Sequence, residues 1–355
     1  MSTAQVSTVA QAQAQHLGIW QDAASLLPNV GREYQLSLGE GQTRAVPLQL
    51  GAQTIWLKHE DENPHGSHKD RAFAYRLSLA KQAGTQAVVL SSSGNAAISC
   101  AAYARQASIK CVLFVSPETE PGKLQALEDF TQARVLVSTR AMRMANYVAA
   151  RYLIPNLRPS LDEFATIGYK TIAFELRRQL EHVDHVFTFV TSASSLVGMA
   201  MGFQELLKAK KIMKLPALHV VQSTGKDALV KASSGSLLAT DAGAVRNLGV
   251  AHSAREKEAL RLLRSTGGSG WSVGREQMET ANQILLSKGI ASSWEGQCTV
   301  AAIKQALHSG QVQGKVVGLL TGKNYPFIPD FQSHFPLVNT FVDVDAQVES
   351  YLYGV

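Results

Sequence analysis

The chain has 355 residues, a formal net charge of +6 at pH 7 and ordinary hydrophobic content, which suits a folded protein with a large core. Basic residues are spread along the chain, and the densest cluster is interpreted as a solvated helix end rather than a nucleic-acid surface: Lys208, Lys210, Lys211 and Lys214. Its three cysteines have no CxxC or histidine spacing, which argues against a zinc site or a disulfide framework.

The first residues, MSTAQVSTVAQAQAQHLGIW, have neither a basic start nor a sustained apolar core, and they are predicted to be disordered or a loose helix. No apolar run approaches the roughly 20 residues that a membrane-spanning helix needs. We therefore expect a soluble, cytoplasmic protein that is not secreted.

Short apolar runs then alternate with helical patterns, which is typical of an α/β protein. A small parallel sheet is predicted from strands at 87–90, 111–115 and 133–137 and helices at 95–107, 122–130 and 141–152. A larger sheet is predicted from helices at 171–180 and 196–208 and strands at 185–190 and 218–221. The GGSG run at residues 267–270 is predicted to be a flexible loop.

The stretch NPHGSHKDR at residues 63–71 opens a helical pattern at residues 72–83. Because its Pro and Gly favour a turn, Lys69 is expected to project from the first turn of this helix. Partial desolvation and the helix N-terminus lower the pKa of such a lysine, so that its amine acts as a nucleophile and later as a base. Taken alone, the stretch is also explained by an ordinary solvated lysine beside an Asp70 cap.

Three further polar loops follow predicted strands, at the carboxyl ends where open α/β sheets bind ligands. SSSGN at residues 91–95 opens a helix and suits a substrate carboxylate, whereas TSASS at residues 191–195 opens another and suits a phosphate. In GLLTG at residues 318–322, the hydroxyl of Thr321 suits a pyridine nitrogen. Each loop alone is also explained as a helix cap or a strand end. Four such stretches in this order favour one ligand site.

These motifs resemble the threonine synthase family, within the larger group of pyridoxal-phosphate (PLP) enzymes folded like the tryptophan synthase β subunit. The matching segments are LGEGQT at 38–43, WLKHE at 56–60, NPHGSHKDR at 63–71, SSGNA at 92–96, GYKTIAFE at 168–175 and LTG at 320–322. The NPxGSxKDR and SSGN motifs together indicate the PLP group. The LGEGxT segment and GYKTIAFE, which is similar to the family's GQKTIAFE, indicate threonine synthases more narrowly.

The resemblance implies that Lys69 is the catalytic residue and carries PLP as a Schiff base. Asn95 would bind the ring hydroxyl of PLP, and Thr321 would face its pyridine nitrogen. The implied cofactor-binding residues are Lys69, Asn95, Thr191, Ser192, Ala193, Ser194, Ser195 and Thr321. The implied substrate-binding residues are Ser92, Ser93, Asn95, Ala96 and Ser160. No metal site is expected.

The resemblance also implies PLP-dependent fold type II, in which two domains have open, mostly parallel twisted sheets flanked by helices. Residues 1–75 and 154–355 are expected to form the large PLP-binding domain, and residues 76–153 the small substrate-clamping domain. PLP is expected in the cleft between them, where closure of the small domain excludes water. A homodimer acting on a small amino-acid substrate is expected, with neither nucleic acid nor membrane as a partner.

The implied reaction of the branch converts O-phosphohomoserine and water to threonine and phosphate, with Lys69 moving the α and β protons. Two departures from the family pattern concern the cofactor. TSASS at residues 191–195 replaces a glycine-rich GNGGT, so that side chains narrow the space for the cofactor phosphate. His68 and His65 replace a Phe and a hydroxyl residue before the lysine, and a packing or surface role is favoured over acid–base chemistry for both.

A third departure concerns the substrate phosphate. PSLDEFA at residues 159–165 replaces an NSxNPxR pattern, so that Ala165 stands at the Arg position. Asp162 and Glu163 would repel a dianion if they faced the site, and Arg158 is a possible substitute for the missing Arg. Two alternatives therefore stay open, namely a PLP enzyme of β- or γ-elimination or replacement on another amino acid, and a non-catalytic relative.

Overall fold

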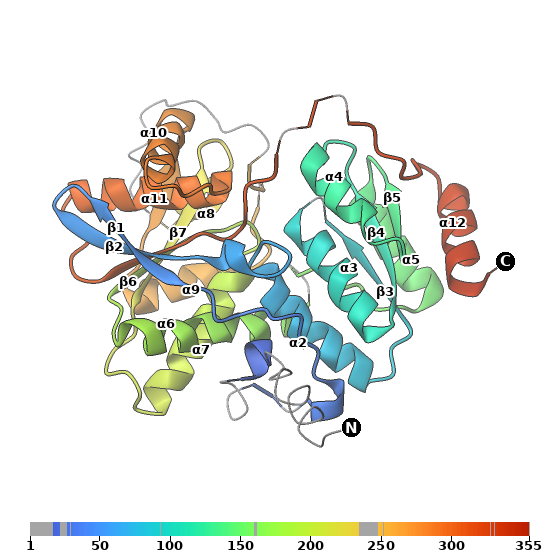
Figure 1. The fold of residues 1–355 in the computed structure, drawn as a ribbon, viewed down its shortest axis with the longest axis horizontal. Coiled ribbons are helices and arrows are strands. Elements are labelled where there is room, and N and C mark those ends of the chain that lie inside the picture. The colour runs from blue at the N-terminus through green and yellow to red at the C-terminus, as the bar shows by residue number, and fades with distance from the viewer. Residues whose placement is uncertain are drawn as a thin grey trace, which may run out of the picture.

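The computed structural model describes residues 17–21, 27–28, 30–92, 94–159, 162–233, 248–250, 252–326, 328–329 and 331–354. Most of the Gln/Ala-rich opening and the predicted site residues Ser93 and Ser160 lie outside the described residues. The described chain forms two sheets, each covered by helices on both faces, which lie side by side (Figure 1). This architecture confirms the predicted α/β class.

The strands are β1 Ala45–Leu50, β2 Gln53–Lys58, β3 Ala87–Ser91, β4 Lys110–Val115, β5 Ala133–Val137, β6 His185–Phe189, β7 Ala217–Ser223, β8 Gly270–Val273 and β9 Val316–Leu319. The α-helices are α2 Lys69–Gln82, α3 Asn95–Ala107, α4 Pro121–Glu128, α5 Ala141–Tyr152, α6 Lys170–Leu180, α7 Ser194–Lys208, α8 Ala228–Ala232, α9 Glu256–Thr266, α10 Arg275–Leu286, α11 Trp294–His308 and α12 Phe341–Tyr353. Short 3-10 helices are η1 Gly18–Trp20, η2 Arg32–Tyr34, η3 Glu60–Glu62 and η4 Glu163–Tyr169. Within the described ranges, no helix is both long and apolar enough to cross a membrane.

The larger sheet has six strands in the order β1-β2-β9-β6-β7-β8, and only the β1–β2 pair is antiparallel. Helices α6, α7 and α9 cover one face and α10 and α11 the other (Figure 1). Strand side chains alternate between the two layers, so Val186 packs with α6 and α7 whereas Phe187 packs with α11. Burial on both faces explains why these strands read as continuous apolar runs.

The smaller sheet has three parallel strands in the order β3-β4-β5. Val88 and Leu90 face a core shared with α2, α3 and α4. Ala87 and Val89 face the opposite core, which α5 and α12 cover. The alternation of parallel strands and helices predicted for residues 87–152 is therefore present in three dimensions.

The C-terminal segment leaves the larger sheet after β9 and crosses to the smaller one, where α12 packs beside β5 and α5 (Figure 1). The segment before α12 joins β5, since the Val338 N–H donates to the carbonyl of Val137 at 2.9 Å. The sequence assigned α12 to the large domain, but its apolar face, with Val344 and Val348, covers the smaller sheet. The domain boundaries themselves stay a prediction.

Most predicted boundaries agree with the structure, and α3, β5 and α5 span the predicted residues. Helix α2 begins at Lys69, three residues before the helical pattern, so Lys69 lies in its first turn as predicted. The prediction of a flexible loop at 267–270 is wrong for its last residue, because Gly270 begins β8 and pairs with Val220. Strand β8 has four residues, too few for periodicity to outweigh the glycine signal.

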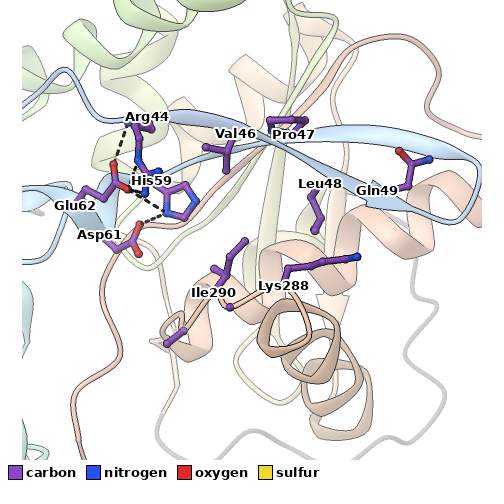
Figure 2. Close-up of a pocket in the computed structure, with 12 residues that line it drawn as sticks. Arg44, Val46, Pro47, Leu48, Gln49, His59, Asp61, Glu62, Lys288 and Ile290 are labelled. Atoms are coloured by element: carbon purple, nitrogen blue, oxygen red, sulfur yellow. Dashed lines mark hydrogen bonds and ion pairs between the residues drawn. The ribbon is translucent and has the colours of Figure 1, made fainter.

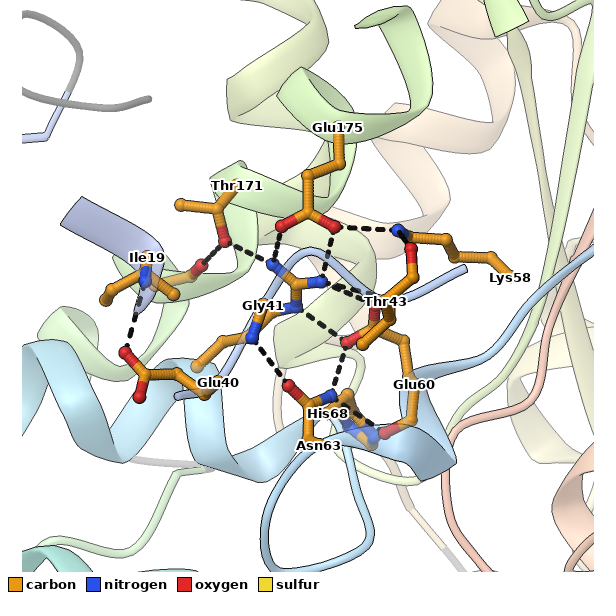
Figure 3. A network of polar contacts seen from close by, with 12 residues as sticks. Ile19, Glu40, Gly41, Thr43, Lys58, Glu60, Asn63, His68, Thr171 and Glu175 are labelled. Atoms are coloured by element: carbon orange, nitrogen blue, oxygen red, sulfur yellow. Dashed lines mark hydrogen bonds and ion pairs between the residues drawn. The ribbon is translucent and has the colours of Figure 1, made fainter. Parts of the chain in front are cut away.

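A buried network of charges joins four of the family-like motifs (Figure 3). The guanidinium of Arg71 donates to both carboxylate oxygens of Glu60 and both of Glu175, at 2.6–2.8 Å. Lys58 Nζ donates to Glu175 Oε2 at 2.7 Å and to the carbonyl of Thr43 at 2.6 Å. These four charged side chains come from β2, η3, α2 and α6, so the network ties the N-terminal hairpin to both helices.

The network contains two cations and two carboxylates, which makes it formally neutral. Burial by itself raises the pKa of Glu60 and Glu175, but Arg71 beside them holds the pKa of both carboxyls below its ordinary value. Both carboxylates therefore stay ionised at neutral pH. Removal of one partner would leave an uncompensated charge in the core, which is far more costly than the loss of an exposed ion pair.

Arg71→Gln is expected to lower the free energy of unfolding by about 3–5 kcal/mol, because Glu60 and Glu175 lose their buried counter-charge. Urea unfolding followed by circular dichroism measures this change. Arg44→Gln is the matched control, since Arg44 pairs with Glu62 at the surface and its side chain is 71% exposed. Equal urea midpoints for the two variants would contradict the structural role of the network.

A second buried polar pair joins β6 and β7 away from the network. His219 Nδ1 accepts from the N–H of Ser269 at 3.1 Å and from Trp271 Nε1 at 3.3 Å. The proton of neutral His219 is therefore on Nε2, which donates to His185 Nδ1 at 3.0 Å. Burial, together with His185, lowers the pKa of His219 to about 3.

Stability is expected to fall as the pH falls from 6.5 toward 3, because an unfolded histidine binds a proton in that window and folded His219 does not. The slope contributed by this residue is about 1.4 kcal/mol per pH unit at most. Urea unfolding at several pH values, compared with His219→Gln, measures it. An equally steep acid dependence in His219→Gln would refute the assignment to this histidine.

Candidate active site

A cavity of about 180 Å³ lies between the two sheets. Its walls come from the start of α2, the β3–α3 loop, α4, the β6–α7 loop, the start of α11 and the segment after β9. The lining residues are His68, Lys69, Ser92, Gly94, Asn95, Ala96, Lys123, Phe189, Thr191, Ser192, Ala193, Ser195, Glu295 and Thr321. The carboxyl ends of β3, β6 and β9 thus meet at one place, as expected for a ligand site in parallel sheets.

Lys69 extends from the first residue of α2 into this cavity. Its Nζ donates a hydrogen bond to Tyr169 Oη at 3.1 Å. Desolvation lowers the pKa of Lys69 to about 8, although the charge of Glu295 acts in the opposite direction. A substantial fraction of its amine is therefore unprotonated just above neutral pH, which a nucleophile or base requires.

The β6–α7 loop brings hydroxyls and a helix N-terminus to the cavity. Thr191, Ser192, Ala193 and Ser195 line it, whereas Ser194 turns away and donates to the carbonyl of Pro159 at 2.8 Å. Helix α7 has 15 residues, and its first N–H groups have no partner within the helix. This end therefore suits an anion such as a phosphate.

Asn95 and Thr321 face the cavity from opposite sheets. The side-chain oxygen of Asn95 is buried without a hydrogen-bond partner. Its amide nitrogen lies close to Gly322, where an added Cβ would come within 2.6 Å of Asn95 Nδ2. Glycine at residue 322 thus leaves room for the Asn95 amide, and the unsatisfied oxygen of that amide favours a polar ligand beside Asn95.

Sequence reasoning missed Lys123, Phe189 and Glu295 as cavity residues, and it missed Tyr169 as the partner of Lys69. Tyr169 was within the matching segment at 168–175, but no local pattern indicates that it contacts residue 69. Lys123 is on α4 of the smaller sheet, and Glu295 is in the first turn of α11. Neither belongs to a motif, so only the packing of the two sheets identifies them.

The departure at residues 159–165 does not bring negative charge into the cavity. Asp162 forms an ion pair with Arg76, and both line a separate surface depression together with Glu163. Ala165 is buried, and the guanidinium of Arg158 contacts Met142 Sδ. The expected repulsion of a dianion is therefore absent, and Arg158 is not among the cavity residues.

The two histidines before Lys69 have different surroundings. His65 packs against the rings of Tyr103 and Phe130, with centroid distances of 6.0 Å, and its Nδ1 lies 3.3 Å from Asp70 Oδ1. His68 instead lines the cavity. Both histidines thus pack against aromatic rings, since the ring of His68 contacts that of Tyr169, but only His68 also faces the cavity.

A larger groove of about 720 Å³ lies between β1 and the turn at residues 288–291 (Figure 2). Four of its charged or titratable side chains pair with one another: His59 Nδ1 lies 3.2 Å from Asp61 Oδ1, and Arg44 Nε donates to Glu62 at 2.8 Å. None of the predicted site residues that the structure describes lines this groove. Chemistry is therefore assigned to the cavity at Lys69.

Comparison with known proteins agrees with this geometry. The family model described as "Pyridoxal-phosphate dependent enzyme" matches residues 36–322, and the chain belongs to that family. The chain is 27% identical over 354 residues to the threonine synthase of Bacillus sp. (strain ULM1), covering 95% of this chain and 98% of that protein. It is 29% identical over 331 residues to the threonine synthase of Methanocaldococcus jannaschii, covering 86% and 80%.

Solved structures show the same fold at low sequence identity. A pyridoxal 5'-phosphate-dependent aspartate racemase aligns with a TM-score of 0.68 at 18% identity, over 87% of this chain and 94% of that one. Maize serine racemase aligns with a TM-score of 0.68 at 14% identity, over 87% and 92%. These similarities confirm fold type II, and the cofactor of the chain is PLP.

The cavity fits PLP. Lys69 would supply the amine, the N-terminus of α7 would supply donors for the phosphate, and the unsatisfied oxygen of Asn95 would be available to a polar group of the cofactor. Thr321 also lines the cavity, so its hydroxyl is available for a hydrogen bond to a ligand from the side of the larger sheet. The individual roles of these residues stay predictions.

Ala193 adopts a left-handed backbone conformation with φ +64°, which costs an L-residue about 1 kcal/mol and costs glycine little. Ala193→Gly is therefore expected to raise the free energy of unfolding by up to about 1 kcal/mol. Ala150→Gly, at an exposed position of α5, should lower it by about 1 kcal/mol. Thermal and urea unfolding of both variants check the opposite signs. A loss of stability in both would contradict strain at Ala193.

Proposed function

We propose that the chain is a PLP-dependent lyase of the threonine synthase type, which converts O-phosphohomoserine and water into threonine and phosphate. The observation that carries this proposal is the enclosed Lys69, whose pKa is lowered to about 8, in a cavity shared by three strand ends. The similarity to threonine synthases over most of the chain supports the branch.

Different residues of the cavity have different proposed roles in this reaction. PLP, when bound, accepts the electron pair left on the substrate after a proton is removed. The amine of Lys69 is placed to take up and return that proton. Ser92, Asn95 and Ala96 surround the N-terminus of α3, which suits the substrate carboxylate.

Lys123 supports an anionic leaving group. It enters the cavity from α4, and its side chain is 14% exposed. Its partner Glu120 is at the surface with a side chain that is 50% exposed, at a distance of 2.9 Å. A desolvated cation facing the cavity attracts a phosphate more strongly than a solvated one does.

A second candidate is a PLP enzyme that catalyses β- or γ-elimination or replacement on another amino acid. The lining of the cavity favours it in one respect: Lys123 and Lys69 are its basic residues apart from His68, and no arginine is among the described lining residues. Arginine binds phosphate with two parallel hydrogen bonds, which lysine cannot do. A smaller or singly charged leaving group would need fewer charged hydrogen bonds from the protein than a phosphate does.

We also propose a cytoplasmic location and a homodimer. Cys100, Cys111 and Cys298 are all free and buried, which suits a reducing compartment. The homodimer is carried over from the resemblance to threonine synthases, and size measurement in solution decides it.

The visible absorption spectrum with added PLP tests the cofactor lysine. The wild type is expected to keep an absorption band after desalting, and Lys69→Ala is expected to lose it, because the amine that binds PLP covalently is absent. Lys323→Ala, at an exposed lysine that is not among the cavity residues, is the control and should keep the band. A band that survives in Lys69→Ala would refute this role of Lys69.

The leaving group is tested with O-phosphohomoserine, O-acetylhomoserine and O-phosphoserine, with products identified by amino-acid analysis. Threonine from O-phosphohomoserine alone is the expected result. Lys123→Ala should raise KM for O-phosphohomoserine by about 10-fold or more, from the loss of one charged hydrogen bond worth about 1.5–3 kcal/mol. Lys110→Ala, outside the cavity, should leave KM unchanged. Turnover of another substrate alone would favour the second candidate.

A further inference from the structure

Two departures from the family pattern meet at the catalytic lysine. His68 stands where the family usually has Phe, and Tyr169 stands where its GQKTIAFE motif has Gln. In the structure, the rings of His68 and Tyr169 contact each other with a centroid distance of 5.3 Å. Both also adjoin Lys69, as its chain neighbour and as its hydrogen-bond partner. The two departures therefore form one cluster.

Tyr169 is held rigidly. Its side chain is fully buried, in the core between α2, α6 and α7. A Cβ at Gly198 of α7 would come within 2.6 Å of Tyr169 Cβ, so the helix backbone packs directly on the tyrosine. A hydroxyl at the end of such a ring has little freedom, in contrast to the flexible side chain of a lysine.

The phenol of Tyr169 is a hydrogen-bonding group and not a base. Burial, with the charges of Glu60 and Asp70 nearby, raises the pKa of Tyr169 above its ordinary value. Its hydroxyl therefore stays protonated and neutral at working pH. In that form it can accept a hydrogen bond from a protonated Lys69 and donate one to an unprotonated Lys69.

His68 is fixed on its other side by Thr321, two residues after β9. The carbonyl of Thr321 accepts from the backbone N–H of His68 at 3.1 Å and lies 2.7 Å from His68 Nδ1. Because a carbonyl only accepts, Nδ1 carries the proton. Burial and the charge of Lys69 lower the pKa of His68 well below its ordinary value. His68 is thus a neutral ring held against Tyr169.

We propose that Tyr169 positions the side-chain amine of Lys69 for proton transfer, and that neutral His68, bonded to Thr321, holds the Tyr169 ring in place. The proposal rests on the proposed function only in assigning proton transfer to Lys69. Three other charged or titratable groups line the cavity with Lys69: Glu295 of α11, His68 and Lys123 of α4. Among the described residues, Tyr169 is the side chain to which Lys69 Nζ is hydrogen-bonded.

Positioning matters here because Lys69 must reach different atoms of a bound substrate from one place. A misplacement of a reacting group by about 1 Å costs about 100-fold in rate. The bond to Tyr169 Oη gives the amine a fixed direction whenever it is not covalently engaged. The Tyr169–His68–Thr321 chain connects that direction to the end of β9 in the larger sheet.

The first test measures Lys69 in the full chain after removal of PLP. The rate of its acetylation by acetic anhydride is followed against pH by peptide mass spectrometry. The wild type is expected to titrate near 8. Tyr169→Phe should titrate at a lower pH than the wild type, because the bond from the charged ammonium to Tyr169 is stronger than the bond to the neutral amine. Tyr147→Phe, on α5 and bonded to Asp345, is the matched control and should titrate as the wild type does.

An unchanged Lys69 titration in Tyr169→Phe would overturn the proposal. His68→Phe should leave the titration within about 0.3 of the wild type, since a neutral ring contributes no charge. A rise of the Lys69 titration by about one pH unit or more in His68→Phe would show that His68 is charged, and it would overturn the role proposed for His68. If Tyr169→Phe does not fold, Tyr169→Gln, whose side chain is shorter and more flexible, should also titrate below the wild type, and a titration equal to that of the wild type would count against positioning by Tyr169.

The second test uses the PLP-loaded enzyme. Exchange of the α proton of O-phosphohomoserine with deuterated water is expected to slow about 100-fold in Tyr169→Phe, with unchanged substrate affinity and melting temperature. A weakened affinity with a normal exchange rate would instead indicate a binding role and refute positioning. Acetylation of Lys69 needs neither cofactor nor substrate, so failure of the proposed reaction and failure of this proposal are distinguishable.

Discussion

The buried guanidinium of Arg71 is the interaction on which the rest of the structure depends. It donates hydrogen bonds to the carboxylates of Glu60 and Glu175, which come from segments far apart in sequence. Because an unpaired charge in the core costs several kcal/mol, the hairpin, α2 and α6 can pack only when all of these groups meet. Lys69 lies two residues before Arg71 on the same helix, so the network that fixes Arg71 also fixes the origin of the Lys69 side chain.

The active site follows from the placement of two parallel sheets next to each other. Each sheet directs strand ends and helix N-termini toward the shared cavity, with α3 from one and α7 from the other. Helix N-termini supply oriented N–H groups without adding a full charge, and the walls exclude enough water to lower the pKa of Lys69 to about 8. Anion binding and an available amine thus have a common origin in the packing.

The departures from the family pattern have different physical meanings. Asp162 is neutralised by Arg76 outside the cavity, so its change in sequence leaves the electrostatics of the site nearly untouched. Ala193 takes a backbone conformation that favours glycine, so its departure acts through local strain. His68 and Tyr169 contact each other beside Lys69, so their departures alter the surroundings of the Lys69 amine.

The sequence by itself determined the α/β class, most element boundaries and the loops that line the cavity, because side-chain periodicity and helix-start signals depend on neighbouring residues. It also placed Lys69 in the first turn of a helix. Only the tertiary structure decided that Tyr169, 100 residues away, contacts Lys69, that Lys123 and Glu295 enter the cavity, and that α12 covers the smaller sheet. These contacts depend on strand order and on the packing of one sheet against the other, which no local pattern encodes.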